Sequence, residues 1–391
     1  MDTSRAWAEV DLDAFESNLK FLRQLLPKGV AMLLVAKANA YGHGAVAVAH
    51  RAISCGVEGL AVTTSAEALE LRSSGIRARI VVLGPVLGNE AAQAIHNQVE
   101  FGVPSDDHCR AVEEIALSIG ARARVHVKID TGMGRLGTRP ADALPLFERI
   151  QASKGLTLAG IMTHIAATDG ARSPQARQQL ERFDGLLEVL KKRGLRSAEN
   201  VWIHASNSAA VLSSMETRYD AVRIGIAAYG IAPHSSLATK ELTPVISIRT
   251  RIAHINHLPT GSSVGYGGTW TAKRESRIAV LPFGYDDGLS WRLSNKGHVL
   301  IHGQRAPIVG RVSMDYTTVD VTHIDQVALG DRVTVLGRDG EQCLPVEEMA
   351  AQIGTIPYEI MCSIGKRVNR IYLGGERGTL IPFQAAHSIN S

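Results

Sequence analysis

Residues 31–44 read AMLLVAKANAYGHG, an apolar run followed at once by a lysine and a glycine-rich turn. Ala31–Ala36 is apolar throughout, which is typical of a strand buried on both faces of a parallel sheet. Lys37 would therefore stand at the carboxyl end of the strand, the end at which barrel enzymes build their active sites. Partial desolvation there favours the neutral, nucleophilic amine. The alternative is a lysine that merely extends from a strand end into solvent.

Seven further β-branched runs alternate with amphipathic segments through the first 240 residues. The strand-like runs are Gly59–Val62, Ile80–Leu83, Glu100–Val103, Arg124–Ile129, Leu158–Thr163, Val201–Ile203 and Ala221–Ile224. The clearest helical segments are Asp13–Leu26, Ser65–Ser74, Ser105–Ile119 and Gln175–Lys192. Strands that alternate with helices over roughly 250 residues predict an α/β fold with a closed (β/α)₈ (TIM) barrel, here over residues 1–240.

The pattern changes after Lys240. Runs such as VISIRTRIAHI and RIAVLPFGY are separated by glycine and proline turn signals. One helix is predicted over Pro345–Ile353, between a proline and Gly354. Residues 241–391 are therefore predicted to form a mostly-β C-terminal domain.

Composition narrows the functional class. The chain has 391 residues, of which 45% are hydrophobic. Its net charge of +4 is too small for its length to indicate a nucleic-acid-binding protein. Its four cysteines form no CxxC pair, which favours free thiols over disulfides or zinc. Neither a signal peptide nor a run of ~20 apolar residues is visible. We expect a cytoplasmic protein that binds neither membrane nor nucleic acid and holds no metal.

The stretch VAKANAYGHG resembles the pyridoxal-phosphate (PLP) attachment signature of alanine racemases, a specific ten-residue pattern. The resemblance covers nearly the whole chain, from AEVDLDAFESNLK to RVNRIYLGG. It implies that Lys37 holds PLP covalently, with Tyr41 beside the cofactor, and serves as one of two catalytic bases. It also implies interconversion of L- and D-alanine, which supplies D-alanine for peptidoglycan.

A second motif, VHVKIDTGMGRLG, contains Lys128, Asp130 and Arg135. Lys128 lies on a strand predicted to be buried, where an uncompensated charge is costly. Pairing with Asp130 is one resolution. The resemblance implies another, carbamylation of Lys128, whose new negative charge would hold Arg135 against the catalytic tyrosine and the substrate carboxylate.

Two strand-end residues are expected near the PLP ring. His164 ends GIMTHIAATD, and Arg223 lies in VRIGIAAYG. A packed histidine and a salt-bridged arginine are the alternatives. The resemblance places His164 in a hydrogen bond with Arg223, and Arg223 at the pyridine nitrogen. Because an arginine is effectively always protonated and cannot accept a proton, the ring nitrogen would stay unprotonated, which limits side reactions such as transamination.

The loops after the last two barrel strands suit a phosphate, as in many barrels. The first offers Asn207 and Ser208 at a helix start, and the second offers the backbone N–H groups of Gly225 and Ile226. Helix capping without a ligand is the alternative for Ser208. By resemblance Tyr358, in IPYEIMCSIGKRV, also binds the phosphate.

Racemisation needs a second base on the opposite face of the substrate. SSVGYGGTW offers Tyr266, although a tyrosine between glycines is commonly only an exposed turn residue. A phenol is a poor base at neutral pH, and Arg135 nearby would favour its phenolate. The resemblance implies that this tyrosine reaches the barrel mouth of a second subunit, and therefore a homodimer with shared sites.

The remaining motifs concern the substrate. GRVSMDYTTVD resembles a loop in which Met314 and Asp315 approach the substrate carboxylate, and Tyr285 in PFGYDDG would line a narrow substrate entrance. Ordinary packing is the alternative for Tyr285. Many family members have Cys-Met-Asp-Gln where this chain has Ser313-Met314-Asp315-Tyr316, so Tyr316 would either tighten the pocket or repack nearby.

Three other functions remain open. A broad-spectrum or serine racemase on the same scaffold is one, since a pocket difference of one small group changes substrate preference by only ~1–3 kcal/mol. Lys128 favours the alanine type. A PLP decarboxylase would place an acid where this chain has Arg223. A non-catalytic PLP carrier would need neither the β domain nor Tyr266.

Overall fold

The computed structural model describes residues 4–166, 173–195, 201–213 and 219–374. By its contacts the chain divides into two units. We call Phe15–Ala40 with Gly44–Thr243 the barrel unit, and the described parts of Met1–Ala14, Tyr41–His43 and Pro244–Ser391 the β unit.

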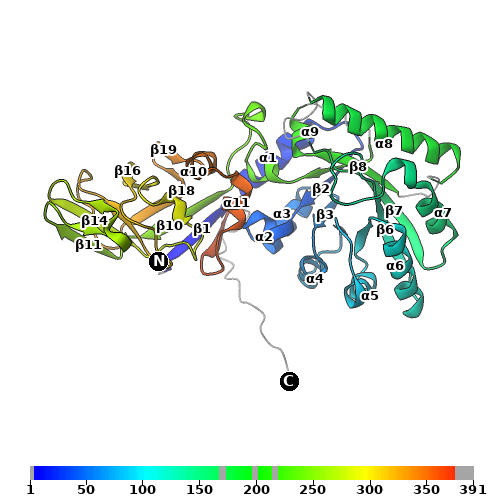
Figure 1. Cartoon of the computed structure of the whole chain (residues 1–391), viewed down its shortest axis with the longest axis horizontal. Helices are drawn as coiled ribbons and strands as arrows, with labels where there is room; N and C mark the ends of the chain where they lie inside the picture. The colour runs from blue at the N-terminus through cyan, green and yellow to red at the C-terminus, as the bar shows by residue number, and fades with distance from the viewer. Residues whose placement is uncertain (1–3, 167–172, 196–200, 214–218, 375–391) are drawn as a thin grey trace, which may run out of the picture. The chain divides into compact units, whose positions relative to one another are not determined.

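Eight parallel strands close the barrel unit in sequence order, from β2 to β9, and β9 pairs with β2 (Figure 1). The predicted (β/α)₈ barrel is therefore confirmed. The strands are β2 (Ala31–Val35), β3 (Gly59–Val62), β4 (Arg79–Val82), β5 (Glu100–Val103), β6 (Ala123–Lys128), β7 (Leu156–Met162), β8 (Trp202–Asn207) and β9 (Ala221–Ile224).

Helical segments connect the strands, and most of them bury apolar side chains. Those described are α1 (Leu12–Gln24), α2 (Lys37–Tyr41), α3 (Ala45–Ser54), α4 (Ser65–Ser73), α5 (Gly88–His96), α6 (Asp106–Ser118), α7 (Leu144–Ala152), α8 (Pro174–Lys192) and α9 (Ser208–Leu212), with short turns η1 (Pro140–Asp142) and η3 (Ile226–Tyr229). In α4 the Thr64 hydroxyl accepts from the Glu67 N–H while the Glu67 carboxylate accepts from Thr64, a capping box that fixes where the helix begins.

The barrel interior is apolar on one side and polar on the other. β2 and β3 are buried along their full length, as their unbroken apolar runs predict. In contrast, β6, β8 and β9 bury His126, Lys128, His204 and Arg223. Buried polar groups need partners, so this side of the barrel is where chemistry is to be sought.

The β unit contains two sheets and a hairpin. The larger sheet has the order β16-β15-β18-β10-β1-β20 with β19 beside β18, the smaller has β11-β14-β17, and β12 pairs with β13. The strands are β1 (Ala6–Asp11), β10 (Ile246–Arg251), β11 (His254–Leu258), β12 (Ser263–Val264), β13 (Trp270–Thr271), β14 (Ser276–Leu281), β15 (His298–Ile301), β16 (Gln304–Pro307), β17 (Thr317–Asp320), β18 (Arg332–Asp339), β19 (Gln342–Leu344) and β20 (Asn369–Leu373).

The mostly-β character of this region is as predicted, and α10 (Val346–Ile353) confirms the helix expected there. Further helical segments are α11 (Pro357–Cys362) and the turns η4 (Ser235–Leu237), η5 (Tyr266–Gly268) and η6 (Trp291–Leu293), of which η4 belongs to the barrel unit.

The N-terminal strand differs from the expected division at residue 240. β1 lies between β10 and β20 in the larger sheet, antiparallel to the first and parallel to the second. Its residues therefore belong to the β unit, although they precede the barrel in sequence. Its buried residues are the small Ala6, Ala8 and Val10 together with Trp7, and its partners lie more than 200 residues away along the chain, so no local pattern marks the pairing.

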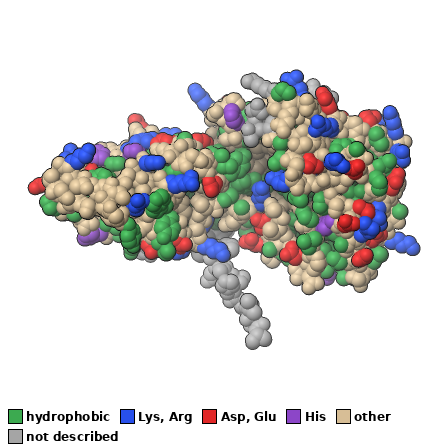
Figure 2. Space-filling view, viewed as in Figure 1, with side chains coloured by type: hydrophobic (Ala, Val, Ile, Leu, Met, Phe, Trp, Pro, Cys, Tyr) green, Lys and Arg blue, Asp and Glu red, His purple; other side chains and the backbone are tan. Residues whose placement is uncertain are grey.

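Positive and negative side chains are interspersed over the visible surface (Figure 2), which fits the small net charge. Among the residues that the structure describes, no helix has the length and apolar character needed to cross a membrane.

Candidate active site

Lys37 begins a turn of unusual backbone conformation. Ala38, Asn39, Ala40 and Tyr41 all have positive φ, between 51° and 53°. Such a left-handed turn costs roughly 1–2 kcal/mol for each residue that is not glycine. Strain of this kind persists only where the surroundings over-determine it, and it gathers at functional sites.

Three side chains hold this turn in the barrel unit. The Glu67 carboxylate accepts from the Ala38 N–H at 2.6 Å and from the Thr63 and Thr64 N–H groups at 2.8 and 3.1 Å. The side-chain oxygen Oδ1 of Asn39 accepts a hydrogen bond from the Ala45 N–H at 2.7 Å. At the last residue of β2, the buried Tyr229 hydroxyl donates a hydrogen bond to the Val35 carbonyl at 2.9 Å. These bonds fix where the Lys37 backbone leaves β2.

Four basic side chains act electrostatically on His164, near the carboxyl ends of the strands. Burial, followed by the charges of Arg223, Lys128, Arg135 and Lys37, lowers the pKa of His164 to about 3. His164 is therefore neutral at physiological pH, and its Nδ1 lies 3.3 Å from an Nη2 of Arg223. The structure thus brings together five of the residues that the sequence singles out.

Lys128 is buried at the end of β6, and burial, aided by Arg223, lowers its pKa to about 7. Asp130 does not neutralise it by an ion pair. Instead the Asp130 carboxylate accepts from the N–H groups of Gly132, Met133 and Gly134 at 2.8–2.9 Å. Burial opposes ionisation of Asp130, but these three donors outweigh it and lower its pKa.

The same loop presents Arg135 to solvent. Gly137 lets the loop fold back, because a Cβ there would lie 2.7–2.9 Å from the backbone of residues 128–130. The structure describes no ion pair or hydrogen bond of the Arg135 guanidinium, which is therefore available to an anion.

Arg223 is the most extensively bonded side chain of the site. One terminal nitrogen donates to the Nδ1 and the carbonyl of His204, both at 2.8 Å. The other donates to the carbonyls of Thr163 and Ala205 at 2.8 and 2.9 Å and approaches His164. Burial lowers its pKa to about 10, so it remains a cation. Within the described chain, its Nε–H is the guanidinium N–H without an acceptor.

The two predicted phosphate loops lie side by side. Asn207 ends β8 and caps α9, accepting from the Ala210 N–H at 3.1 Å. The Ser208 hydroxyl accepts from the Gly225 N–H at 2.9 Å. The Gly225 donor is thus occupied, in contrast to what the sequence predicts, and the Ser208 hydroxyl proton and the Ile226 N–H have no acceptor among the described residues.

In the β unit, the Tyr41 and Tyr358 rings meet edge to face with centroids 6.0 Å apart. Burial raises the pKa of Tyr41 and raises that of Tyr358 to about 12, so both stay protonated donors. Gly42 has positive φ and no room for a side chain, since a Cβ would lie 2.2 Å from the Met361 carbonyl oxygen.

The loops that carry Tyr285, Met314 and Asp315 are bonded to one another. The N–H groups of Tyr285 and Asp286 donate to the carbonyls of Ser313 and Met314 at 3.0 and 3.2 Å. The Asp315 carboxylate accepts from Arg367 at 2.8 Å, and Tyr316 is half-exposed.

Tyr266 lies in a turn between Gly265 and Gly267, both with positive φ, and its side chain is 75% exposed. The described residues of the β unit leave this ring largely uncovered. The exposure fits both the turn-residue interpretation and a ring that acts outside its own unit.

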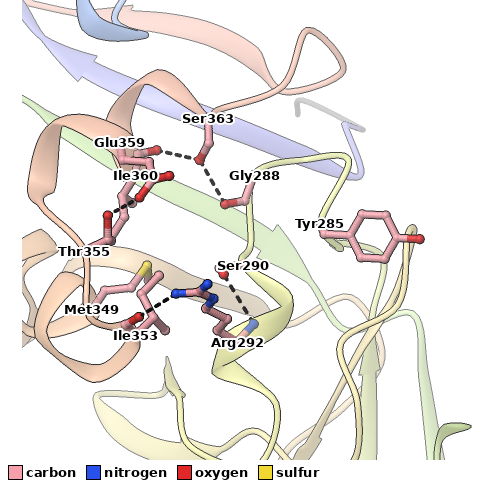
Figure 3. Close-up of a pocket in the computed structure, with 10 residues that line it drawn as sticks. All are labelled: Tyr285, Gly288, Ser290, Arg292, Met349, Ile353, Thr355, Glu359, Ile360 and Ser363. Carbon is pink, nitrogen blue, oxygen red and sulfur yellow. Dashed lines mark hydrogen bonds between the residues drawn. The ribbon is translucent and has the colours of Figure 1, made fainter.

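A separate cavity of about 310 Å³ lies within the β unit, between α10, α11 and the segment that leads into η6 (Figure 3). Thr355 and Glu359 bond to each other there, Ser363 bonds to Gly288, and Arg292 turns towards the Ile353 carbonyl. Of the predicted site residues only Tyr285 borders it, so it is not the predicted site.

The sequence missed Glu67, Asn39 and His204. Glu67 stands in an ordinary capping box, and nothing local shows that it also binds the turn after Lys37. His204, in VWIHASN, could have been suspected because it directly follows the strand predicted over Val201–Ile203, although the structure places it within β8.

Comparison with known proteins agrees with this architecture. Residues 10–233 match the family model described as alanine racemase, N-terminal domain, and residues 245–372 match that of its C-terminal domain. Alanine racemase of Methanococcus maripaludis is 39% identical over 94% of this chain and 98% of its own. Alanine racemase 2 of Caldanaerobacter subterraneus is 40% identical over 93% and 94%.

Solved structures agree as well. Alanine racemase from Bacillus anthracis with bound L-Ala-P superposes with a TM-score of 0.90 at 34% identity, over 97% of both chains. Alanine racemase from Bartonella henselae with covalently bound pyridoxal phosphate gives 0.84 at 28% identity, over 95% of this chain and all of that one. Both family models, the relatives and the fold agree, and the chain belongs to the alanine racemase family.

Proposed function

We propose that this chain interconverts L- and D-alanine with PLP as its cofactor, using Lys37 and Tyr266 as the two bases. The observation that carries the proposal is the position of Lys37. It leaves β2 in a strained, over-determined turn, and its charge acts on His164 together with that of Arg223 on the neighbouring strand β9. A lysine that merely extended into solvent would need neither the strain nor the cations.

The donors of the site fit PLP, the cofactor of this family. The Arg223 Nε–H suits a ring nitrogen that can only accept a hydrogen bond. The Ser208 hydroxyl, the Ile226 N–H and the Asn207 loop suit a phosphate. We propose Tyr41 and Tyr358, which their raised pKa values keep protonated, as further donors. When bound, PLP supplies an electron sink for negative charge at the substrate Cα.

The protein's part in the reaction is to place protons and charges. Lys37 Nζ would move a proton on one face of the substrate Cα, and Tyr266 Oη on the other. Arg135 would bind the substrate carboxylate, with Met314 and Asp315 close by and Tyr285 at the entrance. His164, neutral by its lowered pKa, would add a polar contact without a further charge.

Lys128 is suited to carbamylation. Only a neutral amine reacts with carbon dioxide, and an amine of pKa about 7 is substantially neutral at physiological pH. The carbamate would place a negative charge among Arg135, Arg223 and Lys37. Acetate should partly restore the activity of a Lys128→Ala variant, and a variant that carboxylic acids cannot restore argues against the modification.

The exposure of Tyr266 supports a homodimer, which we propose as the working form. The β unit exposes large apolar side chains that a monomer would be expected to cover, namely Tyr266, Tyr285, Trp291, Met314, Tyr316 and Ile356. A second copy that covers them would bring Tyr266 to a site. Supply of D-alanine for peptidoglycan in the cytoplasm is the cellular role that we propose with it.

Chiral analysis of L-alanine and L-serine, each incubated with the purified protein and PLP, tests the function. Formation of D-alanine with little D-serine supports the proposal. Comparable rates for both substrates indicate a broad-spectrum racemase. If no D-product forms while PLP is still bound to Lys37, the chain is a PLP carrier or a PLP decarboxylase and not a racemase.

A further inference from the structure

A chain of four buried side chains runs through the interior of the barrel unit. Glu100 Oε2 lies 2.7 Å from His126 Nε2, and His126 Nδ1 lies 2.9 Å from His204 Nε2. His204 Nδ1 lies 2.8 Å from Arg223 Nη1. Both histidines are fully buried, and Glu100 and Arg223 are each 4% exposed. We call these four residues the relay.

The two ends of the relay dictate the position of every proton between them. A guanidinium can only donate, so His204 Nδ1 must accept and His204 Nε2 must carry the proton. That proton requires His126 Nδ1 to accept, so the His126 proton is on Nε2, where the Glu100 carboxylate accepts it. Both histidines are then neutral and each has a single tautomer. Burial lowers the pKa of both, which agrees with neutral rings.

The far end of the relay is anchored by two arginines. Glu100 begins β5, and its Oε1 accepts from Arg124 Nε at 2.8 Å and pairs with Arg79 at 3.3 Å. Burial alone would raise the pKa of Glu100, but its interaction with His126, the charge of Arg79 and the hydrogen bond from Arg124 lower it. The carboxylate is therefore a fixed acceptor.

The middle of the relay is anchored by packing. A Cβ at Gly160 on β7 would lie 2.2 Å from His126 Nδ1 and 2.7 Å from the Trp202 carbonyl oxygen. Glycine at this position therefore leaves room for the His126 ring where it meets its partners, and a side chain would displace it.

The near end orients Arg223. With His204 and three backbone carbonyls as acceptors, both terminal nitrogens are occupied, and the guanidinium plane cannot turn. We propose that Glu100, His126 and His204 are positioning residues, which hold Arg223 so that its Nε–H is the donor left for the cofactor ring. The inference rests on the proposed function for its catalytic consequence, but the relay itself does not.

The relay is tested first in the unmodified protein without cofactor. Two-bond ¹H–¹⁵N spectra of ¹⁵N-histidine-labelled apoprotein should show two neutral rings protonated at Nε2, with slowly exchanging, downfield N–H protons, from about pH 5 to about pH 8. Absence of these signals, or a ring that becomes doubly protonated in this range, would overturn the relay.

Two substitutions at one position then test positioning. His126→Gln keeps an acceptor and a donor side by side, whereas His126→Phe keeps the ring volume and removes both. His126→Phe should lose the slowly exchanging His204 signal, weaken PLP binding by the apoprotein about 10-fold and lower kcat 10–100-fold, the range seen when outer partners of a functional group are removed. KM for alanine should change little. His126→Gln should restore the His204 signal and most of kcat.

His108→Phe is the matched control, because His108 is also buried in the barrel unit and its ring, among the described residues, bonds only the Val86 carbonyl. It should leave kcat and PLP affinity unchanged. Equal losses in His126→Phe and His126→Gln, or kcat and PLP affinity within about threefold of the unmodified protein in His126→Phe, would overturn the positioning role. A protein that shows the relay signals but never racemises alanine would instead refute the proposed function.

Discussion

Glu67 is predicted to be required for the turn that carries Lys37. Its carboxylate accepts three backbone N–H groups, one of which belongs to Ala38, the first left-handed residue after the lysine. The left-handed turn stores roughly 4–8 kcal/mol over its four residues. Removing one of the bonds that over-determine it should therefore affect both stability and the position of Lys37.

The magnitude follows from the number and exposure of the bonds. A hydrogen bond to a charged group contributes about 1.5–3 kcal/mol where it is buried. These three are exposed, so water replaces part of each, and we expect Glu67→Ala to lower the free energy of unfolding by about 2 kcal/mol. Because a displacement of about 1 Å can cost 10²-fold in rate, kcat should fall by about that factor.

Urea denaturation and steady-state kinetics measure the two effects. Glu70→Ala is the matched control, since Glu70 is exposed on the same helix and makes no side-chain bond within the described chain. It should cost less than about 0.5 kcal/mol and leave kcat unchanged. The reasoning fails if Glu67→Ala is no less stable than this control, or if it retains full kcat.

Three further predictions concern other parts of the two units. Gly160→Ala should lower the free energy of unfolding by more than about 4 kcal/mol, or prevent folding, because its Cβ would overlap the His126 ring. Gly185→Ala on α8, which has open space around it, is the control and should raise the free energy of unfolding by about 0.5–1 kcal/mol. A normal urea midpoint for Gly160→Ala would contradict the predicted overlap. Asp287→Asn should lower thermal stability by about 3 kcal/mol, since this fully buried carboxylate accepts from Arg367 and the Gly284 N–H; an unchanged Tm would refute it. In carbon dioxide-free buffer, unmodified Lys128 has a pKa of about 7 in the folded protein, against 10.5 ordinarily, so between these pH values the unfolded chain binds the extra proton and the free energy of unfolding should rise with pH. Lys128→Met should flatten this pH dependence of stability. Equal slopes of stability against pH in the two proteins would contradict the pKa shift.

The barrel could be predicted because its strands are continuous apolar runs with helices between them. β2 and β3 are buried on both faces, and such runs need no knowledge of partners. β1 could not be predicted, because its short alternation becomes a strand only through pairing with β10 and β20.

The site was predictable in its residue types and less so in its geometry. Lys37, His164 and Arg223 are visible as polar residues that follow or end apolar strands. The left-handed turn is not, since Ala38 and Ala40 have no preference for positive φ and depend on tertiary bonds. The relay is likewise invisible, because His126 and His204 are 78 residues apart and each alone resembles a packed core histidine.

The central claim, two bases on opposite faces, is tested most directly by following the α-hydrogen of each alanine enantiomer in D₂O with the Tyr266→Phe variant. If Lys37 and Tyr266 each move a proton on one face, inversion should fall by about 10²–10⁴-fold, while exchange of the α-hydrogen of one enantiomer with solvent continues. If inversion and exchange fall together for both enantiomers, or both persist, a single group moves the proton on both faces and the two-base account is wrong.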